Sequence, residues 1–142
     1  MLYLTQTDTT VGFLSVDRAS IAKAKNRDIN QPFLITLSSL DKQKRLVRTP
    51  SRFKNMVRRS KKTTFLYPNK KAIRVVRDTP HSNFLDKFDF LYSSSANKHG
   101  CLFDYSFAYE RADIIVEDRE GFLQKSASSF YKLGKKKILK LR

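Results

Sequence analysis

Two cations separated by a single residue, Lys25-Asn26-Arg27, are the first candidates for chemistry in this 142-residue sequence. They stand where a predicted helix ends. Residues two apart do not share a helix face, but a backbone turn at the helix end could direct both side chains toward one anion. Basic side chains are also favoured at a helix C-terminus by the helix dipole alone. The tripeptide therefore allows either an anion site or a structural role.

A polar loop at residues 93–100, Ser-Ser-Ser-Ala-Asn-Lys-His-Gly, follows a predicted strand. Hydroxyls, an amide and a glycine after the carboxyl end of a strand are typical of loops that bind anions or other ligands. The same residue types also form ordinary turns between a strand and a helix. The loop by itself leaves both interpretations open.

Arg74 interrupts the apolar strand predicted at residues 72–76. Side chains alternate along a strand, so Arg74 faces away from Ile73 and Val75, toward either solvent or a ligand. A guanidinium is suited to holding a carboxylate through two parallel hydrogen bonds.

Two segments are strongly basic: residues 42–62 carry ten Lys and Arg and residues 132–142 carry six, with no acidic residue in either. The formal net charge of the whole chain is +16. Such a charge predicts affinity for nucleotide phosphates, RNA or anionic lipid headgroups. A solvated basic face or a compositional bias explains the same numbers. Phe53 and Met56, inside the first segment, are expected to anchor a helix to the core.

The remaining composition excludes several classes of site. Cys101 is the only cysteine, so there is no intramolecular disulfide, and the two histidines, His81 and His99, are too few for a zinc or haem site and are expected in surface turns. No nucleophile elbow, HExxH or Walker loop is present. Residues 1–10 do not resemble a signal peptide, and no apolar run could span a bilayer. We expect a cytoplasmic protein without a metal site or membrane association.

Apolar runs and helix caps predict the elements that would position these residues. With 40% hydrophobic and 12% aromatic residues, the chain can form one core, which predicts a single domain over residues 1–142. Strands alternate with helices, and both a hairpin and crossovers occur, which favours an α/β fold with a mixed sheet. Residues 5–12 are expected to form a loop. We expect helices from about 15–17 to 25, after 38–39, after 49–50, and at 80–88 and 104–111, and strands at 2–5, 33–37, 63–67, 72–76, 90–93, 113–117, 129–133 and 137–141.

Taken in order, these motifs resemble those of the YrdC-like (YrdC/YwlC) threonylcarbamoyl-AMP synthases over nearly the whole chain. The specific part is Lys25-Asn26-Arg27 with Pro32-Phe33, similar to K-x-R-x-x-x-x-P-L, together with the segment 94–100, similar to T-S-A-N-x-S-G. Five further segments match the family motifs more loosely. Residues 7–12 are similar to P-T-E-T-V-Y-G, residues 64–66 to the strand that follows P-G-P-V-T, and residues 72–75 to A-V-R-V. Residues 127–131 are similar to P-S-T-V-V, and residues 138–140 to I-L-R.

The resemblance implies a twisted α/β sheet with flanking helices and a basic concave face. It also implies a reaction in which threonine, bicarbonate and ATP give threonylcarbamoyl-AMP and pyrophosphate, for threonylcarbamoylation of tRNA. The resemblance implies ATP as the nucleotide substrate with Mg²⁺ as its counterion. It also implies tRNA or double-stranded RNA and the tRNA threonylcarbamoyl-transfer complex as partners of the protein. Such chemistry brings two anions together, which explains why no acid–base pair is needed.

The resemblance also implies roles for individual residues. Binding of the ATP phosphates and catalysis would depend on Lys25, Arg27, Ser95 and Asn97. Further nucleotide contacts would come from Thr64 and Lys140. The threonine substrate would be bound by Arg74, Thr7 and Ser128.

The chain departs from the family pattern at several of these positions. Gln6 replaces a proline, His99 a serine, and Lys140 an arginine, for which Arg142 could substitute. Ligand binding tolerates such changes more easily than turnover does. The alternatives are therefore a non-catalytic relative that binds nucleotide or RNA on its basic concave surface, and a subunit whose site another protein completes.

Overall fold

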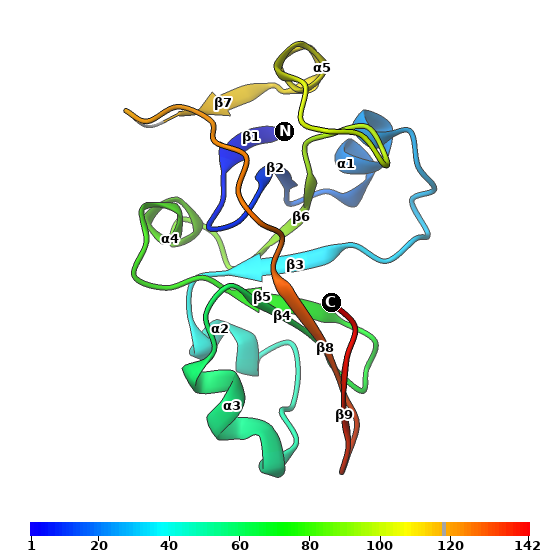
Figure 1. Cartoon of the computed structure of the whole chain (residues 1–142), viewed down its shortest axis with the longest axis vertical. Coiled ribbons are helices and arrows are strands. Elements are labelled where there is room, and N and C mark those ends of the chain that lie inside the picture. The colour runs from blue at the N-terminus through cyan, green and yellow to red at the C-terminus, as the bar shows by residue number, and fades with distance from the viewer. Residues whose placement is uncertain (118) are drawn as a thin grey trace. The chain divides into compact units, whose positions relative to one another are not determined.

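The computed structural model describes residues 1–117 and 119–142 (Figure 1). The chain forms two compact units, each built from two separate stretches of sequence. Unit 1 comprises Met1–Phe33 and Leu91–Ala127, and unit 2 comprises Leu34–Phe90 and Ser128–Arg142. No helix of the described residues is both long and apolar enough to cross a membrane.

Unit 1 is a mixed sheet with two helices. Its strands lie in the order β7-β1-β2-β6, with β1–β2 and β2–β6 antiparallel and β1–β7 parallel. Leu4, Phe13, Ile21 and Phe107 are among the residues of its core. The elements are β1 (Tyr3–Gln6), β2 (Val11–Ser15), α1 (Arg18–Lys25), β6 (Leu91–Ser95), α5 (Tyr105–Arg111) and β7 (Ile114–Val116).

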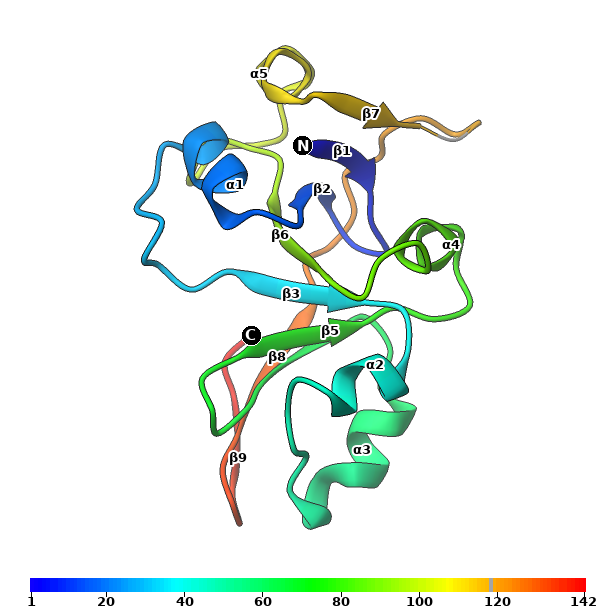
Figure 2. The same ribbon diagram turned by 180° about the vertical axis from the view of Figure 1, so that it is seen from behind.

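Unit 2 is also a mixed sheet, with strands in the order β3-β5-β4-β8-β9 (Figure 2). The β3–β5 and β4–β8 pairs are parallel, and the β4–β5 and β8–β9 pairs are antiparallel. The elements are β3 (Leu34–Leu37), α2 (Leu40–Lys44), the 3-10 helix η1 (Ser51–Phe53), α3 (Lys54–Arg59), β4 (Thr63–Leu66), β5 (Ala72–Val75), α4 (Pro80–Leu85), β8 (Ser129–Leu133) and β9 (Ile138–Lys140).

The structure confirms the predicted α/β class with its mixture of parallel and antiparallel pairs. Side-chain caps explain several helix starts. Asp17 accepts a hydrogen bond from the Ala19 amide at 3.0 Å to begin α1, and Ser39 accepts one from the Lys42 amide at 3.2 Å to begin α2. In α4 the proline occupies the first turn behind a Thr79 capping box.

The strand β2 was missing from the sequence prediction, which placed Val11 and Gly12 in a loop. Every residue of β2 is buried, so it lacks the alternating pattern that marks a half-exposed strand. Its glycine is needed for packing, because a Cβ atom at Gly12 would lie 3.0 Å from the Thr7 Cγ2 and 3.2 Å from the Leu14 Cδ1.

Candidate functional site

The Lys25 ammonium joins the end of α1 to the loop that follows β6, within unit 1. It donates hydrogen bonds to the main-chain oxygen of Ser95 at 2.9 Å and to the side-chain oxygen of Asn97 at 3.2 Å, and a further one to the Asn97 main-chain oxygen. The Asn97 amide nitrogen donates to the Cys101 carbonyl at 2.6 Å, which fixes the orientation of the amide. Two motifs separated by about 70 residues therefore meet at one cation.

The backbone at Asn26 explains why the helix ends between the two basic residues. Asn26 has φ 50° and ψ 50°, the left-handed conformation that asparagine tolerates better than most residues. The Arg27 amide then donates to the Ala22 carbonyl at 3.0 Å, which closes the helix end. Lys25 is therefore the last residue of α1, and Arg27 lies beyond the helix end.

Arg27 takes a different direction from Lys25. Its Nε donates to the Gln31 Oε1 at 3.0 Å and its Nη2 to the Pro32 carbonyl at 3.1 Å, while the guanidinium lies 4.6 Å from the centre of the Phe33 ring. The structure thus holds Arg27 on the segment that leads out of α1, rather than on the Ser95–Asn97 turn.

The two cations still influence each other electrostatically. Burial, and secondarily the charge of Arg27, lower the pKa of Lys25 from 10.5 to about 8. Lys25 therefore remains mainly protonated at neutral pH, and an anion bound beside it would relieve the repulsion. The Ser95 side chain is exposed and could add a hydroxyl donor. The three hydrogen bonds that Lys25 donates all go to oxygens of the chain, so an anion would have to replace at least one of them.

Thr7 lies in the turn between β1 and β2, and its hydroxyl organises that turn. It accepts a hydrogen bond from the Thr9 amide at 3.1 Å and donates to the Thr10 carbonyl. The residue is only 3% exposed. A direct contact of Thr7 with threonine or nucleotide stays a prediction.

In unit 2, Ser128 is the centre of a buried hydrogen-bond cluster. Its hydroxyl lies 2.9 Å from the Thr64 hydroxyl and 3.0 Å from the Arg142 Nη2, and its carbonyl accepts from the Arg142 Nε at 2.8 Å. Lys140 is exposed on β9. Of the two C-terminal cations considered in the sequence, Arg142 is the one bonded to Ser128.

Arg74 is buried, so its side chain does not face open solvent. It lies in register with Thr36 of the neighbouring strand β3. His81 of α4 is buried as well, although the sequence suggested a surface turn; His99 is exposed as expected. Burial, followed by the charge of Arg74, lowers the pKa of His81 from 6.5 to about 4, and neither ring nitrogen has a hydrogen-bond partner within the described part of the chain. Unit 2 therefore contains a buried cation with a neutral imidazole within range of its charge.

No protein-family model matches the sequence, and no curated protein matches it significantly. Solved structures do match. Two structures of P. abyssi Sua5, one of them complexed with L-threonine, share 17% identity, with TM-scores of 0.81 and 0.80 over 99% of this chain. The chain has the YrdC-like fold. The resemblance seen in the sequence motifs is thereby confirmed for the fold.

Two further structures with the YrdC-like fold extend the comparison. YciO from E. coli shares 15% identity with a TM-score of 0.71, covering 99% of this chain and 82% of that one. HypF in a phosphate- and nucleotide-bound form shares 12% identity with a TM-score of 0.72, covering 99% of this chain and 26% of that one. This chain spans about half the length of Sua5, because the match covers 49% of the Sua5 chain.

Proposed function

We propose that residues 1–142 form a single YrdC-like domain that acts as an L-threonylcarbamoyladenylate synthase. It would convert threonine, bicarbonate and ATP to threonylcarbamoyl-AMP and pyrophosphate, for use by a tRNA threonylcarbamoyl-transfer complex. The observation that carries the proposal is the contact of the Lys25 ammonium with the Ser95–Asn97 turn. This contact joins the two motifs on which the resemblance to synthases depends.

The nucleotide role falls mainly on unit 1. A phosphate oxygen would replace the main-chain oxygens that now accept from Lys25, and the charge of Arg27 would add to the attraction. The exposed Ser95 hydroxyl and the Asn97 amide would donate further hydrogen bonds. The HypF structure, of which this chain matches 26%, holds phosphate and nucleotide, and this is consistent with a nucleotide ligand.

The threonine role falls mainly on unit 2. Arg74 supplies a buried cation for the carboxylate, and the low pKa of His81 keeps a second charge from competing with it. Ser128 offers a hydroxyl that Thr64 and Arg142 orient. We assign to Arg142 the nucleotide contact that the sequence gave to Lys140. The threonine complex of Sua5 supports an amino-acid ligand for this fold.

The chemistry needs positioning and charge neutralisation. Threonine and bicarbonate would first give N-carboxythreonine, with loss of water. A carbamate oxygen of this intermediate would attack the α-phosphorus of ATP, the bond from that phosphorus to the bridging oxygen would break, and pyrophosphate would leave. Fixed cations lower the barrier by holding the developing negative charge. The described residues contain no group of three or more His, Cys, Asp or Glu placed to hold a metal. Mg²⁺ would be carried by the phosphates of ATP and would neutralise part of their charge.

Pyrophosphate release tests the proposal. We expect release only when ATP, threonine and bicarbonate are all present, and its loss in both Lys25→Ala and Arg27→Ala while circular dichroism shows an intact fold. Lys23→Ala is the matched control, because Lys23 is an exposed lysine of the same helix. Release that survives both substitutions would rule out the assigned phosphate site.

A further inference from the structure

The positive charge of the chain is concentrated in one of its two units. Unit 2 contains 21 of the 29 Lys and Arg residues but only four of the 13 Asp and Glu residues. Its formal net charge is therefore +17, and that of unit 1 is −1. Any general affinity for polyanions should reside in unit 2, whereas the Lys25 site belongs to unit 1.

Folding brings the two basic segments of unit 2 together. The Arg52 Nη1 donates to the Lys136 carbonyl at 2.8 Å, and the Ser129 amide donates to the Lys62 carbonyl at 3.0 Å where β8 runs beside β4. Residues 42–62 and 132–142 are thus connected in space although they are distant in sequence. A continuous surface attracts a polyanion more strongly than separate charges do.

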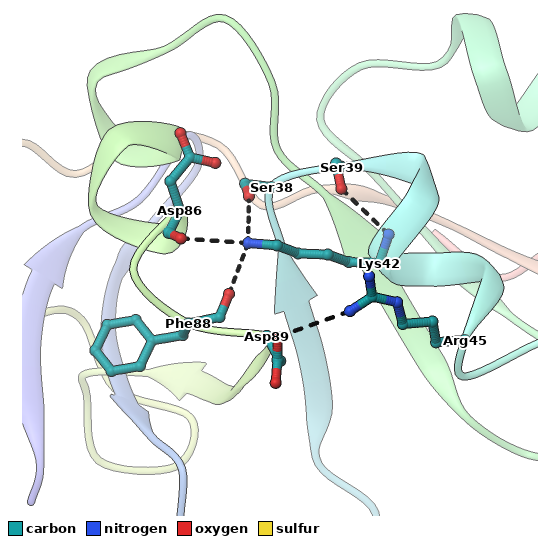
Figure 3. A network of polar contacts seen from close by, with 7 residues as sticks. All are labelled: Ser38, Ser39, Lys42, Arg45, Asp86, Phe88 and Asp89. Carbon is teal, nitrogen blue, oxygen red and sulfur yellow. Dashed lines mark hydrogen bonds and ion pairs between the residues drawn. The ribbon is translucent and has the colours of Figure 1, made fainter.

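Some basic side chains of residues 42–62 bond to other parts of unit 2 (Figure 3). Lys42 donates to the Ser38 hydroxyl at 3.2 Å and to the Phe88 carbonyl at 2.7 Å, and Arg45 lies 3.9 Å from the Asp89 carboxylate. These contacts fasten α2 to the turn that follows α4. Lys42 is therefore not counted among the cations offered to a ligand, and Arg45 is not among the residues that line the cleft between α2 and α3.

Four other cations of the segment line a cleft of about 560 Å³ between α2 and α3. Its apolar lining comes from Leu40, Val47 and Val57. The exposed cations along it are Lys44, Arg48, Lys54 and Arg58.

The cleft holds little negative charge of its own. Buried Gln43 lines it and donates a hydrogen bond to the Tyr67 hydroxyl, whose pKa burial raises to about 12, so that this group stays neutral. Asp41 pairs with Lys44 at 3.7 Å, but both side chains are exposed and such a pair is weak. A cleft bounded by one sign of charge and apolar walls concentrates the electrostatic potential.

We propose that the cleft between α2 and α3 binds single-stranded nucleic acid, with phosphates on the four cations and bases against the apolar lining. Phosphate contacts supply most of the affinity in such complexes. Only an unstacked strand can present base surface to an apolar cleft, because a duplex hides that surface. This proposal does not rest on the synthase activity.

A lipid surface fits the same charge less well. Helices that lie in a membrane interface expose a face of large apolar side chains. In the described part of unit 2, the exposed large apolar residues are Ile138, Leu139 and Leu141, on or just after β9, and α2 and α3 expose cations instead. Anionic vesicles are therefore a comparison in the test rather than the proposed partner.

Fluorescence anisotropy with the full chain and a labelled single-stranded RNA of about twelve nucleotides tests the site. We expect Lys54→Gln/Arg58→Gln to bind on the order of tenfold more weakly at 0.1 M salt, with a salt slope lower by about 1.4 for two lost phosphate contacts. The matched control is Lys23→Gln/Lys125→Gln in unit 1, which removes the same charge and is expected to bind like the wild type. Lys44→Gln/Arg48→Gln provides a second test if the first variant does not fold.

Several results would overturn the proposal. Equal losses in the cleft and control variants would show that binding follows net charge alone. Inorganic polyphosphate or duplex RNA binding as tightly as the single strand would remove the role of the apolar lining. Binding to anionic vesicles but not to RNA would indicate a membrane partner instead. The absence of binding to any of these probes would also refute the proposal. Pyrophosphate release by the cleft variant should be unchanged, so the failure of either proposal can be recognised separately.

Discussion

The Lys25 ammonium donates a hydrogen bond at 3.2 Å to the side-chain oxygen of Asn97, which lies 72 residues later in the chain. The contact links the end of α1 to the loop after β6, and both belong to the anion site that we propose. Asn26 ends α1 directly after Lys25, and Gly12 of β2 lies in register with Ser95 of β6. The conformation of each can be tested through stability.

The end of α1 at Asn26 gives the first prediction. Its left-handed φ of 50° costs an alanine about 1 kcal/mol, whereas a glycine adopts it without strain. We expect Asn26→Ala to lower the free energy of unfolding by about that amount and Asn26→Gly to leave it nearly unchanged. Chemical denaturation measures both. Equal stability of the two variants would show that the conformation is not maintained in solution.

The packing of Gly12 gives a second prediction. A Cβ atom there would approach the Thr7 Cγ2 to 3.0 Å, so Gly12→Ala should destabilise the chain by about 1–3 kcal/mol. Thr7→Ser removes the opposing methyl group, and we expect the double variant to recover part of the loss. Denaturation of the single and double variants tests the contact. A double variant no more stable than Gly12→Ala would place the clash elsewhere.

His81 makes stability depend on pH. Its pKa is lowered from 6.5 to about 4 in the folded chain, so between these values the unfolded chain takes up a proton that the folded chain does not. The free energy of unfolding should therefore fall as the pH drops from 6.5 toward 4, by up to about 1.4 kcal/mol per pH unit. Above pH 6.5 this contribution is fully present.

Denaturation of two variants between pH 6.5 and 4.5 isolates this effect. His81→Gln should lose the part of the slope due to His81, while His99→Gln should keep it because His99 is exposed. Identical slopes in the wild type and His81→Gln would contradict the burial of a neutral imidazole.

The C-terminal cations give the fourth prediction. Arg142 and Lys140 are both exposed, but of the two it is Arg142 that donates two hydrogen bonds to Ser128. We expect Arg142→Ala to lower pyrophosphate release roughly tenfold, the effect of losing a charge-assisted hydrogen bond, and Lys140→Ala to change it little. Arg142→Lys should not restore the rate, because a single ammonium lacks the planar fork of arginine. A larger loss of pyrophosphate release in Lys140→Ala than in Arg142→Ala would show that Lys140 makes the nucleotide contact.

Local signals predicted much of the fold. Asp17, Ser39 and Pro80 mark helix starts through caps and proline chemistry that need no tertiary information. The strand β2 was missed because it is buried throughout and follows a run of hydroxyl residues. The burial of His81 was missed because it depends on the packing of α4, which the composition of a short helix does not reveal.

Less of the candidate site than of the fold could be predicted from the sequence. Spacing alone leaves Lys25 and Asn97 unrelated, and only the order of family motifs suggested that they meet. The bond between Arg142 and Ser128 depends on the course of the chain beyond β9. The concentration of charge in unit 2 could not be foreseen either, because the unit combines two distant stretches that strand pairing brings together.

Calorimetric titration of ATP into the wild type, Lys25→Ala and Lys23→Ala tests the central claim most directly. The Lys25 site predicts that Lys25→Ala weakens ATP binding at least roughly tenfold, since charge-assisted hydrogen bonds to phosphate are lost, and that Lys23→Ala binds like the wild type. A folded Lys25→Ala variant with wild-type affinity for ATP would contradict the account.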